Sequence, residues 1–447
     1  MFNVRFHATR ASRRLPMFIA LFAGACQSYQ ARPLDLPAHE KAFLARPHLS
    51  PDAPFDLADG VTLSEAEAVA IVFNADLRIA RLRAGVTLAG AENAGLWEDP
   101  VIGVDLTRIL ASVADPWKLA ATVGFTIPVS GRLDIEKAKA KHEHVTELLR
   151  VEQREWQARI NLRRAWARWS MLSAQAAATR EFVDRSGQVL GIVDMMESAG
   201  EIPRTEARLF RIEKATTQSS LLLFEAQLAS STLAIKQLMG LAPAAPVELL
   251  PTTFEVPTGD LDAASRVMQS PAMRVAIAEY EVAEQSLQLE VRKQYPDLNL
   301  SPGYEREDGN DQVLLGISVP LPILNANRRG IAEANALREL SRAVAETVLE
   351  QLIGDLAEAA VQRDAAAEQR IFLESEIIPL VDAEYADARE IARLGEVNTL
   401  VLLESLVRQQ DAQVRLIDAR LAEVLATIRF EELLGPPIPA GDEGGAP

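Results

Sequence analysis

Gly124-Phe-Thr-Ile-Pro128-Val is followed, 192 residues farther along the chain, by Gly316-Ile-Ser-Val-Pro320-Leu. Before each proline, apolar and polar side chains alternate, which is the pattern of a β-strand with two different faces. Upstream, Asn74-Ala-Asp-Leu-Arg78 matches Ser270-Pro-Ala-Met-Arg274 at an offset of 196 residues. Downstream, Ala199-Gly-Glu-Ile202 matches Leu394-Gly-Glu-Val397 at an offset of 195. A nearly constant offset over this length indicates that the chain contains one structural unit twice.

The stretches around these pairs predict that each unit is a helix, two strands and a long helical hairpin. Residues 133–196 contain no proline and are rich in residues that favour helix. At about 1.5 Å per residue, this helix would be roughly 95 Å long. Residues 331–394 repeat it, and Pro379 is expected to kink the second copy. Its apolar residues follow the 3,4,3 spacing of a coiled-coil seam at Leu349, Leu352, Leu356 and Ala359.

These patterns divide the chain into segments. We expect a first repeat over residues 61–250, with strands within 101–128, and a second over 251–435, with strands within 297–320. Residues 26–60 are predicted to be an extended linker, and residues 436–447, rich in proline and glycine, a disordered tail. The acidic run over residues 305–311 predicts an exposed loop between the last two strands.

The N-terminus has the pattern of an export signal over residues 1–25. Basic residues extend to Arg14, an apolar stretch follows, and small residues precede Cys26. Cys26 is the only cysteine, so an intramolecular disulfide is excluded. Its position resembles a bacterial lipobox, which predicts a lipidated Cys26 at the start of the mature chain. Ala23-Gly-Ala25 also fits ordinary signal-peptidase cleavage, which would leave the cysteine unmodified.

The alternating strands suit either a soluble antiparallel sheet with one wet face or a membrane barrel. Strand pairs that are each followed by a helix of roughly 95 Å leave no globular core for a soluble sheet to cover. Four strands cannot close a barrel, so several chains must share one, and three chains would supply twelve strands. The predicted fold class is therefore mainly α with a small β part: a long coiled-coil α-helical barrel, plus four strands per chain in a shared transmembrane β-barrel.

The chemistry of an enzyme or of a nucleic-acid binder is missing from this sequence. The net charge of -17 opposes binding to phosphates. His142 and His144 are two residues apart, so on a helix they point to different faces and are not expected to share a metal ion. No phosphate-binding loop, nucleophile elbow or CxxC motif is present. We expect no catalytic activity, no cofactor, no metal site and no nucleic-acid partner.

Several motifs resemble those of a known family. The run Gly316-Ile-Ser-Val-Pro-Leu-Pro-Ile-Leu-Asn325-Ala-Asn-Arg-Arg-Gly330 is similar to the strand-to-helix junction of TolC-like outer-membrane efflux factors. Leu63-Ser-Glu-Ala-Glu-Ala68, Tyr295-Pro-Asp-Leu298 and the two Gly-Glu turns fit the same family. The likeness covers about residues 60–437 and occurs twice in register. It is greatest to the branch that serves tripartite pumps for heavy-metal cations or drugs.

The resemblance implies a homotrimer in the outer membrane, lipid-anchored and extending into the periplasm, that passively conducts metal cations or drugs. Its partners would be outer-membrane lipid, a periplasmic adaptor protein and an inner-membrane pump of the resistance-nodulation-division type. In the family, the adaptor meets the hairpin turns. That docking role falls here on Ala199, Gly200, Glu201, Ile202, Leu394, Gly395, Glu396 and Val397.

Other interpretations compete with this one. A periplasmic adaptor or scaffold lipoprotein is also exported and built around a helical hairpin, but it normally carries only one hairpin. The outer-membrane duct of a protein secretion system would share every feature described above. An exported enzyme would need a visible catalytic constellation.

Overall fold

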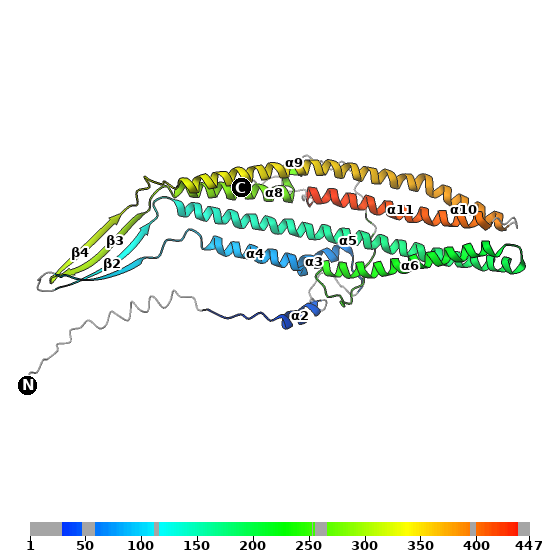
Figure 1. The fold of residues 1–447 in the computed structure, drawn as a ribbon, viewed down its shortest axis with the longest axis horizontal. Helices are drawn as coiled ribbons and strands as arrows, with labels where there is room; N and C mark the ends of the chain where they lie inside the picture. Colours follow the sequence, from blue (N-terminus) through cyan, green and yellow to red (C-terminus); the bar gives the residue numbers. More distant parts are fainter. Residues whose placement is uncertain are drawn as a thin grey trace, which may run out of the picture.

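The computed structural model describes residues 29–46, 59–110, 116–252, 254, 266–393 and 399–436. They form a long, narrow molecule with a four-stranded sheet at one end and the turns of helical hairpins at the other (Figure 1). The long helices run along its axis, so the strands and the hairpin turns lie at opposite ends. The prediction of a mainly helical chain with a small β part is confirmed.

The two repeats contain the same order of elements. The first consists of α3 (Leu63–Phe73), α4 (Ala75–Glu92), β1 (Val101–Arg108), β2 (Trp117–Ile127), α5 (Arg132–Ala199) and α6 (Arg204–Leu238). The second consists of a 3-10 turn η2 (Val267–Gln269), α8 (Pro271–Arg292), β3 (Leu298–Glu307), β4 (Asn310–Ser318), α9 (Arg328–Phe372), a π-helical turn η3 (Leu373–Ile377), α10 (Ile378–Arg393) and α11 (Thr399–Leu434). With 68 residues, α5 alone is about 100 Å long.

The N-terminal linker differs from the expected extended chain because it contains a helix, α2 (Leu36–Leu44). Asp35 caps the helix, since its side chain accepts a hydrogen bond from the backbone N–H of Ala38 at 2.9 Å. Pro37 lies in the first turn, where its missing N–H costs nothing. Together these two residues start a helix that we had not predicted.

All four strands form one antiparallel sheet in the order β1-β2-β3-β4, so the pairing of β2 with β3 joins the two repeats. The predicted loop over residues 305–311 is wrong, because β3 and β4 extend through it. Only Asp308 and Gly309 lie in the turn, with φ values of 47° and 78°. An Asp-Gly pair with two positive φ angles is the preferred two-residue hairpin turn.

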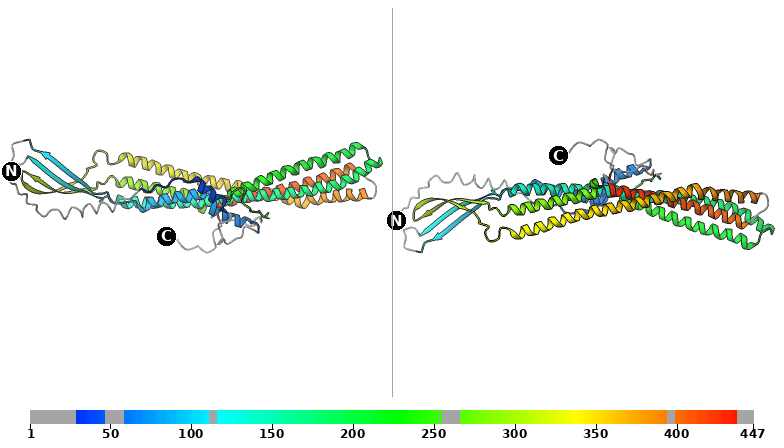
Figure 2. Two further views of the ribbon diagram at one scale, coloured as in Figure 1. Left: turned by 90° about the horizontal axis from the view of Figure 1, so that it is seen from below. Right: turned by 90° about the horizontal axis from the view of Figure 1, so that it is seen from above.

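The helices nearest the sheet continue its order. Helix α4 contacts α5, α5 contacts α8, and α8 contacts α9. Farther from the sheet, α5 contacts both α6 and α11, and α11 contacts α9 and α10. Both views in Figure 2 show the same narrow outline, with the two hairpins reaching toward the end opposite the sheet. The layer therefore has two open edges: β1 and α4 on one side, β4 and α9 on the other.

Each repeat has a joint where its returning helix ends against its first helices. Gly240 follows α6 with a φ of 74°, and Gly435 follows α11 with a φ of 81°. A Cβ on Gly240 would lie 2.3 Å from the carbonyl oxygen of Phe73, and one on Gly435 would lie 2.5 Å from Cδ of Pro271. Glycine is therefore required at both positions, because of the positive φ angle and because there is no room for a Cβ. We call the contact of Gly240 with Phe73 and Asn74 the first joint, and that of Gly435 with Pro271 the second joint.

The largest core cluster in the described part of the chain lies at the first joint and includes Leu162, Trp166, Trp169 and Met239. The rings of Trp166 and Trp169 meet edge to face, with centroids 5.8 Å apart and planes at 61°. The core of the second joint contains Leu352, Leu356 and Ala359, with Leu349 packed against it. The predicted coiled-coil seam is therefore part of this core.

The second long helix is interrupted close to Pro379, where we expected a kink. Proline cannot donate a hydrogen bond to the carbonyl four residues earlier, and its ring crowds that carbonyl. The chain responds with the π-helical turn η3 just before Pro379, and α10 then continues to Arg393.

Among the residues that the structure describes, no helix combines the length and the apolar composition needed to cross a membrane.

Candidate functional site

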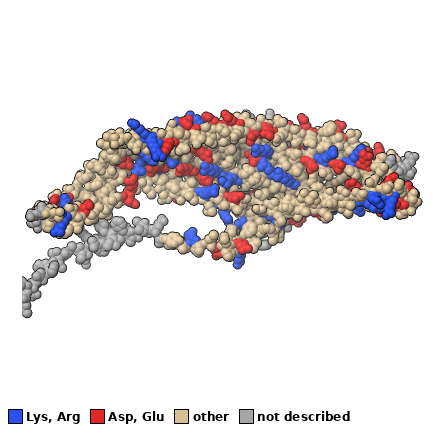
Figure 3. Space-filling view, in the orientation of Figure 1, with Lys and Arg blue, Asp and Glu red and all other residues tan. Residues whose placement is uncertain are grey.

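The strand register collects apolar side chains on one face of the sheet. Paired positions such as Val104 with Ala121 and Tyr304 with Val313 lie on this face. Many of its side chains are exposed, with Val104 at 67%, Val313 at 88% and Leu315 at 67%. The strand end is accordingly mostly free of charged side chains in Figure 3, except near its extremity. An exposed apolar surface of this kind marks a contact with lipid or protein.

The opposite face of the sheet is polar. Thr126 donates a hydrogen bond to the side chain of Asn299 at 3.1 Å. Lys118 forms an ion pair with Glu305 and lies 3.5 Å from a carboxylate oxygen of Glu307. Glu305 is only 7% exposed, and a buried carboxylate needs a partner of opposite charge, which Lys118 supplies. The alternation predicted from the sequence thus becomes one apolar and one polar surface.

The turn between α5 and α6 is well defined. Gly200 has a φ of 77°, its N–H donates to the carbonyl of Glu197 at 3.0 Å, and Glu201 N–H donates to the carbonyl of Met196 at 2.9 Å. This pair of hydrogen bonds is a Schellman motif, which ends α5. Ala199, Gly200 and Glu201 are exposed, whereas Ile202 packs against the cluster beside the turn.

Helix α11 begins beside this turn. Thr399, its first residue, is buried and donates a hydrogen bond to the side chain of Glu206 in the first turn of α6. Leu403 of α11 packs against the cluster of Val193, Ala207 and Phe210. The beginning of α11 is therefore bound to the α5–α6 turn. The matching positions Leu394, Gly395, Glu396 and Val397 lie outside the described residues, as does Cys26.

A cavity of about 380 Å³ lies between α5, α10 and α11 near this end. Val189 and Ile192 give it an apolar wall, while Arg185, Tyr385 and Arg389 add polar groups. Arg185 donates a hydrogen bond to the side chain of Gln409 at 3.1 Å, and its buried Nε has no hydrogen-bond partner among the described residues. Sequence analysis missed this cavity, because Arg185 and Arg389 look like ordinary charged residues on helix surfaces.

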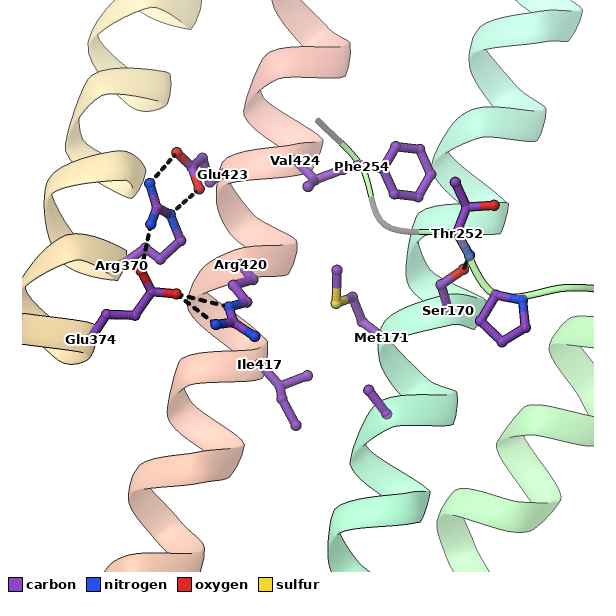
Figure 4. A pocket seen from close by; sticks show the side chains of 12 residues that line it. Ser170, Met171, Thr252, Phe254, Arg370, Glu374, Ile417, Arg420, Glu423 and Val424 are labelled. Atoms are coloured by element: carbon purple, nitrogen blue, oxygen red, sulfur yellow. Dashed lines mark hydrogen bonds and ion pairs between the residues drawn. The ribbon is translucent and has the colours of Figure 1, made fainter. Parts of the chain in front are cut away.

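A larger cavity of about 520 Å³ lies at mid-length, where the two repeats meet (Figure 4). Met171 of α5 and Ile417 of α11 face each other across it. On the α11 side lie four charged residues, which we call the charge cluster: Arg370, Glu374, Arg420 and Glu423.

The charge cluster connects α9 and η3 to α11. Arg370 donates to both carboxylate oxygens of Glu423, at 2.5 and 3.3 Å, and to Glu374 at 2.6 Å. Arg420 donates to Glu374 at 2.7 Å. The guanidinium groups of Arg420 and Arg370 lower the pKa of Glu374. Each charge therefore has a partner, and the arrangement holds two helices together rather than activating a nucleophile or base.

The two histidines face different neighbours, as expected. His142 Nδ1 lies 3.3 Å from Glu281 on α8, and His144 Nδ1 lies 3.2 Å from the hydroxyl of Thr87 on α4. Within the described part of the chain, no group of three His, Cys, Asp or Glu side chains could hold a metal ion.

Residues 267–436 match the model of a protein family described as Outer membrane efflux protein. Among curated proteins, the cobalt-zinc-cadmium resistance protein CzcC of Cupriavidus metallidurans is 24% identical over 252 residues. That alignment covers 53% of this chain and 58% of CzcC, so the chain matches somewhat more than half of its relative's length.

Two solved structures show the same fold over most of their length. CusC, a protein that forms a transmembrane channel, matches with a TM-score of 0.71 and 16% identity, covering 83% of this chain and 92% of CusC. The outer membrane protein VceC of Vibrio cholerae matches with a TM-score of 0.72 and 16% identity, covering 83% of this chain and 96% of VceC. The predicted resemblance to the outer-membrane efflux factors is confirmed.

Proposed function

We propose that this chain, a TolC-like outer-membrane efflux factor, forms with two further copies of itself the exit channel of a tripartite efflux system. The observation that carries the proposal is the pair of open edges of the protomer. Among the described residues, β1 and α4 have no further strand or helix on their outer side at one edge, and β4 and α9 have none at the other. Edges that differ from each other join head to tail, and a ring closes such contacts.

The two edge helices carry matching apolar stripes. On α4, Ile79, Leu82 and Val86 are exposed at 48%, 67% and 73%. On α9, the exposed stripe has the same spacing and consists of Leu337, Leu340 and Val344, at 58%, 59% and 43%.

These stripes lie at similar heights above the sheet. Leu82 is ten residues, or about 15 Å, from the sheet-proximal end of α4, and Leu340 is twelve residues, or about 18 Å, from that of α9. Helix α4 of one copy can therefore pack on α9 of the next, while β1 pairs with β4.

A closed ring would hide both strand edges, which matters because unpaired backbone groups are not tolerated in lipid. Three copies supply twelve strands, whose exposed apolar face would contact the lipid of the outer membrane while the polar face lines the channel. The helices then continue the channel into the periplasm. No bond is made or broken by such a duct, so it acts without catalysis or a cofactor.

The name of CzcC favours divalent metal cations as cargo, with drugs as the other class. We infer that a lipid on Cys26 anchors the mature chain in the outer membrane. The exposed residues Ala199, Gly200 and Glu201, with Ile202 and the matching residues 394–397, are proposed to receive a periplasmic adaptor. The adaptor would connect the duct to an inner-membrane pump of the resistance-nodulation-division type.

Disulfide cross-linking tests the ring. A protein with Leu82→Cys and Leu340→Cys should form covalent dimers and trimers in outer membranes, whereas either single variant should not. Val361 is a suitable control for the second position, because it is 70% exposed on α9 but about 32 Å farther along the helix. Monomers only, or equal cross-linking through Val361→Cys, would contradict the proposed ring.

Resistance assays test the coupling to a pump. Cells that lack the protein should become sensitive to divalent metal ions or to drugs, and Gly200→Asp with Gly395→Asp should mimic that loss while the trimer persists. Aspartate tolerates a positive φ better than most residues, so the turn at Gly200 should still form. Gly191→Asp is the matched control, because it lies on α5 with open space around it. Normal resistance with both turns altered would exclude docking at the turns.

A further inference from the structure

The N-terminal arm, residues 29–46, is attached to the body by its last residue. The Arg46 guanidinium donates hydrogen bonds to the carbonyls of Phe73 at 3.2 Å and Gly240 at 2.5 Å. It also lies over the rings of Phe43 and Phe73, at 4.9 and 5.6 Å from their centroids. Phe73 ends α3 and Gly240 follows α6, so one side chain satisfies carbonyls at two helix ends in the first joint.

The second joint is capped in the same way, but from a different place. Arg266 donates to the carbonyls of Gly435 at 3.0 Å and Pro436 at 3.2 Å. Arg266 directly precedes η2, within its own repeat. In the first repeat, the position 196 residues earlier is Ala70, which is 1% exposed and has no side chain that could reach a carbonyl. The first repeat thus has no counterpart of Arg266, and Arg46 caps the carbonyls of the first joint instead.

The rest of the arm makes little contact with the body. Every residue of α2 except Phe43 is exposed, and Leu34 and Leu36 are 84% and 62% exposed. From α2, the chain over residues 29–35 runs toward the strand end of the molecule (Figure 1). The arm is thus held at the first joint and points toward the end that contains the sheet.

The reach of the chain from Cys26 to Arg46 matches the distance between the sheet end of α5 and the first joint. The nine residue-to-residue steps from Cys26 to Asp35 reach at most about 31 Å. Helix α2 adds about 14 Å, and the last two residues add about 7 Å. The sum is about 50 Å. Along α5, the 34 residues from Arg132, beside the sheet, to Trp166, at the first joint, also span about 50 Å. An arm anchored at the level of Arg132 would have to be almost fully extended.

We propose that Arg46 is a clasp that makes the arm a taut tether between the membrane anchor at Cys26 and the first joint. The proposal rests on the proposed function, which places the strand end in the outer membrane and a lipid on Cys26. Arg46 is a positioning residue in this role: it holds the joint at a fixed distance below the membrane.

Shortening the arm tests the tether. Deletion of residues 30–33 would shorten its reach by about 14 Å. In outer-membrane vesicles, the deletion should pull Arg46 from its carbonyls and lower the temperature at which the trimer dissociates on a gel. The drop should equal that of Arg46→Gln, and the two changes combined should give no further drop. Insertion of four Gly and Ser residues at the same site should leave the dissociation temperature unchanged.

Removal of the lipid anchor shows whether the deletion acts by pulling on Arg46 or by disturbing the arm locally. In a Cys26→Ser protein, cleavage after Ala25 would release an unanchored arm, so the deletion should have no effect while Arg46→Gln still lowers the dissociation temperature. An equal drop with and without Cys26, no drop at all, or a mass showing unmodified Cys26 would each overturn the tether. Absence of the unaltered protein from the outer membrane would instead overturn the proposed function itself.

Discussion

Alanine at Gly240 should destabilise the chain far more than alanine at Gly200, although the two glycines have almost the same backbone angle, 74° and 77°. At Gly200 none of the described residues lies within 4 Å of an added Cβ, so only the left-handed conformation is penalised, by about 1–2 kcal/mol. At Gly240 the same penalty is joined by a contact of 2.3 Å with the carbonyl oxygen of Phe73. Overpacking of this kind costs about 1–3 kcal/mol more, so the expected total is roughly 2–5 kcal/mol.

The comparison can be made by thermal unfolding of the three purified proteins, followed by circular dichroism at 222 nm under one detergent condition. Gly435→Ala is a second test of the same reasoning, because its Cβ would lie 2.5 Å from Pro271 and its φ is 81°. It should behave like Gly240→Ala. Equal shifts for Gly200→Ala and Gly240→Ala would refute the conclusion that the joints, rather than the backbone angle alone, require glycine.

Two further predictions concern charged residues that pair between helices. Arg370→Met should leave Glu423, which is 5% exposed, without its partner and cost about 3–5 kcal/mol, while Arg370→Met combined with Glu423→Leu should recover most of the stability in the same unfolding experiment. The pKa of Glu374 is lowered by Arg420 and Arg370, and that of Glu432 is lowered because hydrogen bonds from Arg164 and other neighbours outweigh its burial. Their contribution to stability is complete above the unfolded value of 4.5 and is lost as the pH falls below it through the lower folded values. The melting temperature should therefore drop between pH 5 and pH 3, and less so in Glu432→Gln; an unchanged drop in that variant would contradict the assignment.

The repeat made most of the fold predictable. Long stretches without proline predict long helices, and the alternation near Phe125 and Ile317 predicts strands, because each signal depends only on local geometry. The same signals give the same order of elements in both repeats, which is stronger evidence for that order than either repeat alone. The turn at Asp308 and Gly309 was also present in the sequence as an Asp-Gly pair, but the acidic residues around it favoured a longer loop.

The contacts between distant segments were not predictable. Arg370 and Glu374 are four residues apart, so their pairing on one helix follows from spacing alone. The pairing of Arg370 with Glu423 depends on how α9 and α11 are aligned, and nothing in either helix specifies that alignment by itself. Arg46 and Gly240 are separated by 194 residues. Their contact can be predicted only when the packing of α3 against the end of α6 is already known.

The tryptophans are distributed unevenly along the molecule. Trp166 and Trp169 are buried in the core of the first joint, and Trp156 is buried against Val424 and Ile428 of α11. Trp97 and Trp117 are exposed toward the strand end at 64% and 50%. No tryptophan follows residue 169 in the sequence, so the hairpin halves that extend beyond the joints contribute nothing to indole emission. Intrinsic fluorescence of this protein will therefore report on the region of the joints and on the strands, but not on the hairpin turns. A single tryptophan introduced near the tip, for example Leu403→Trp, would give that region a signal of its own.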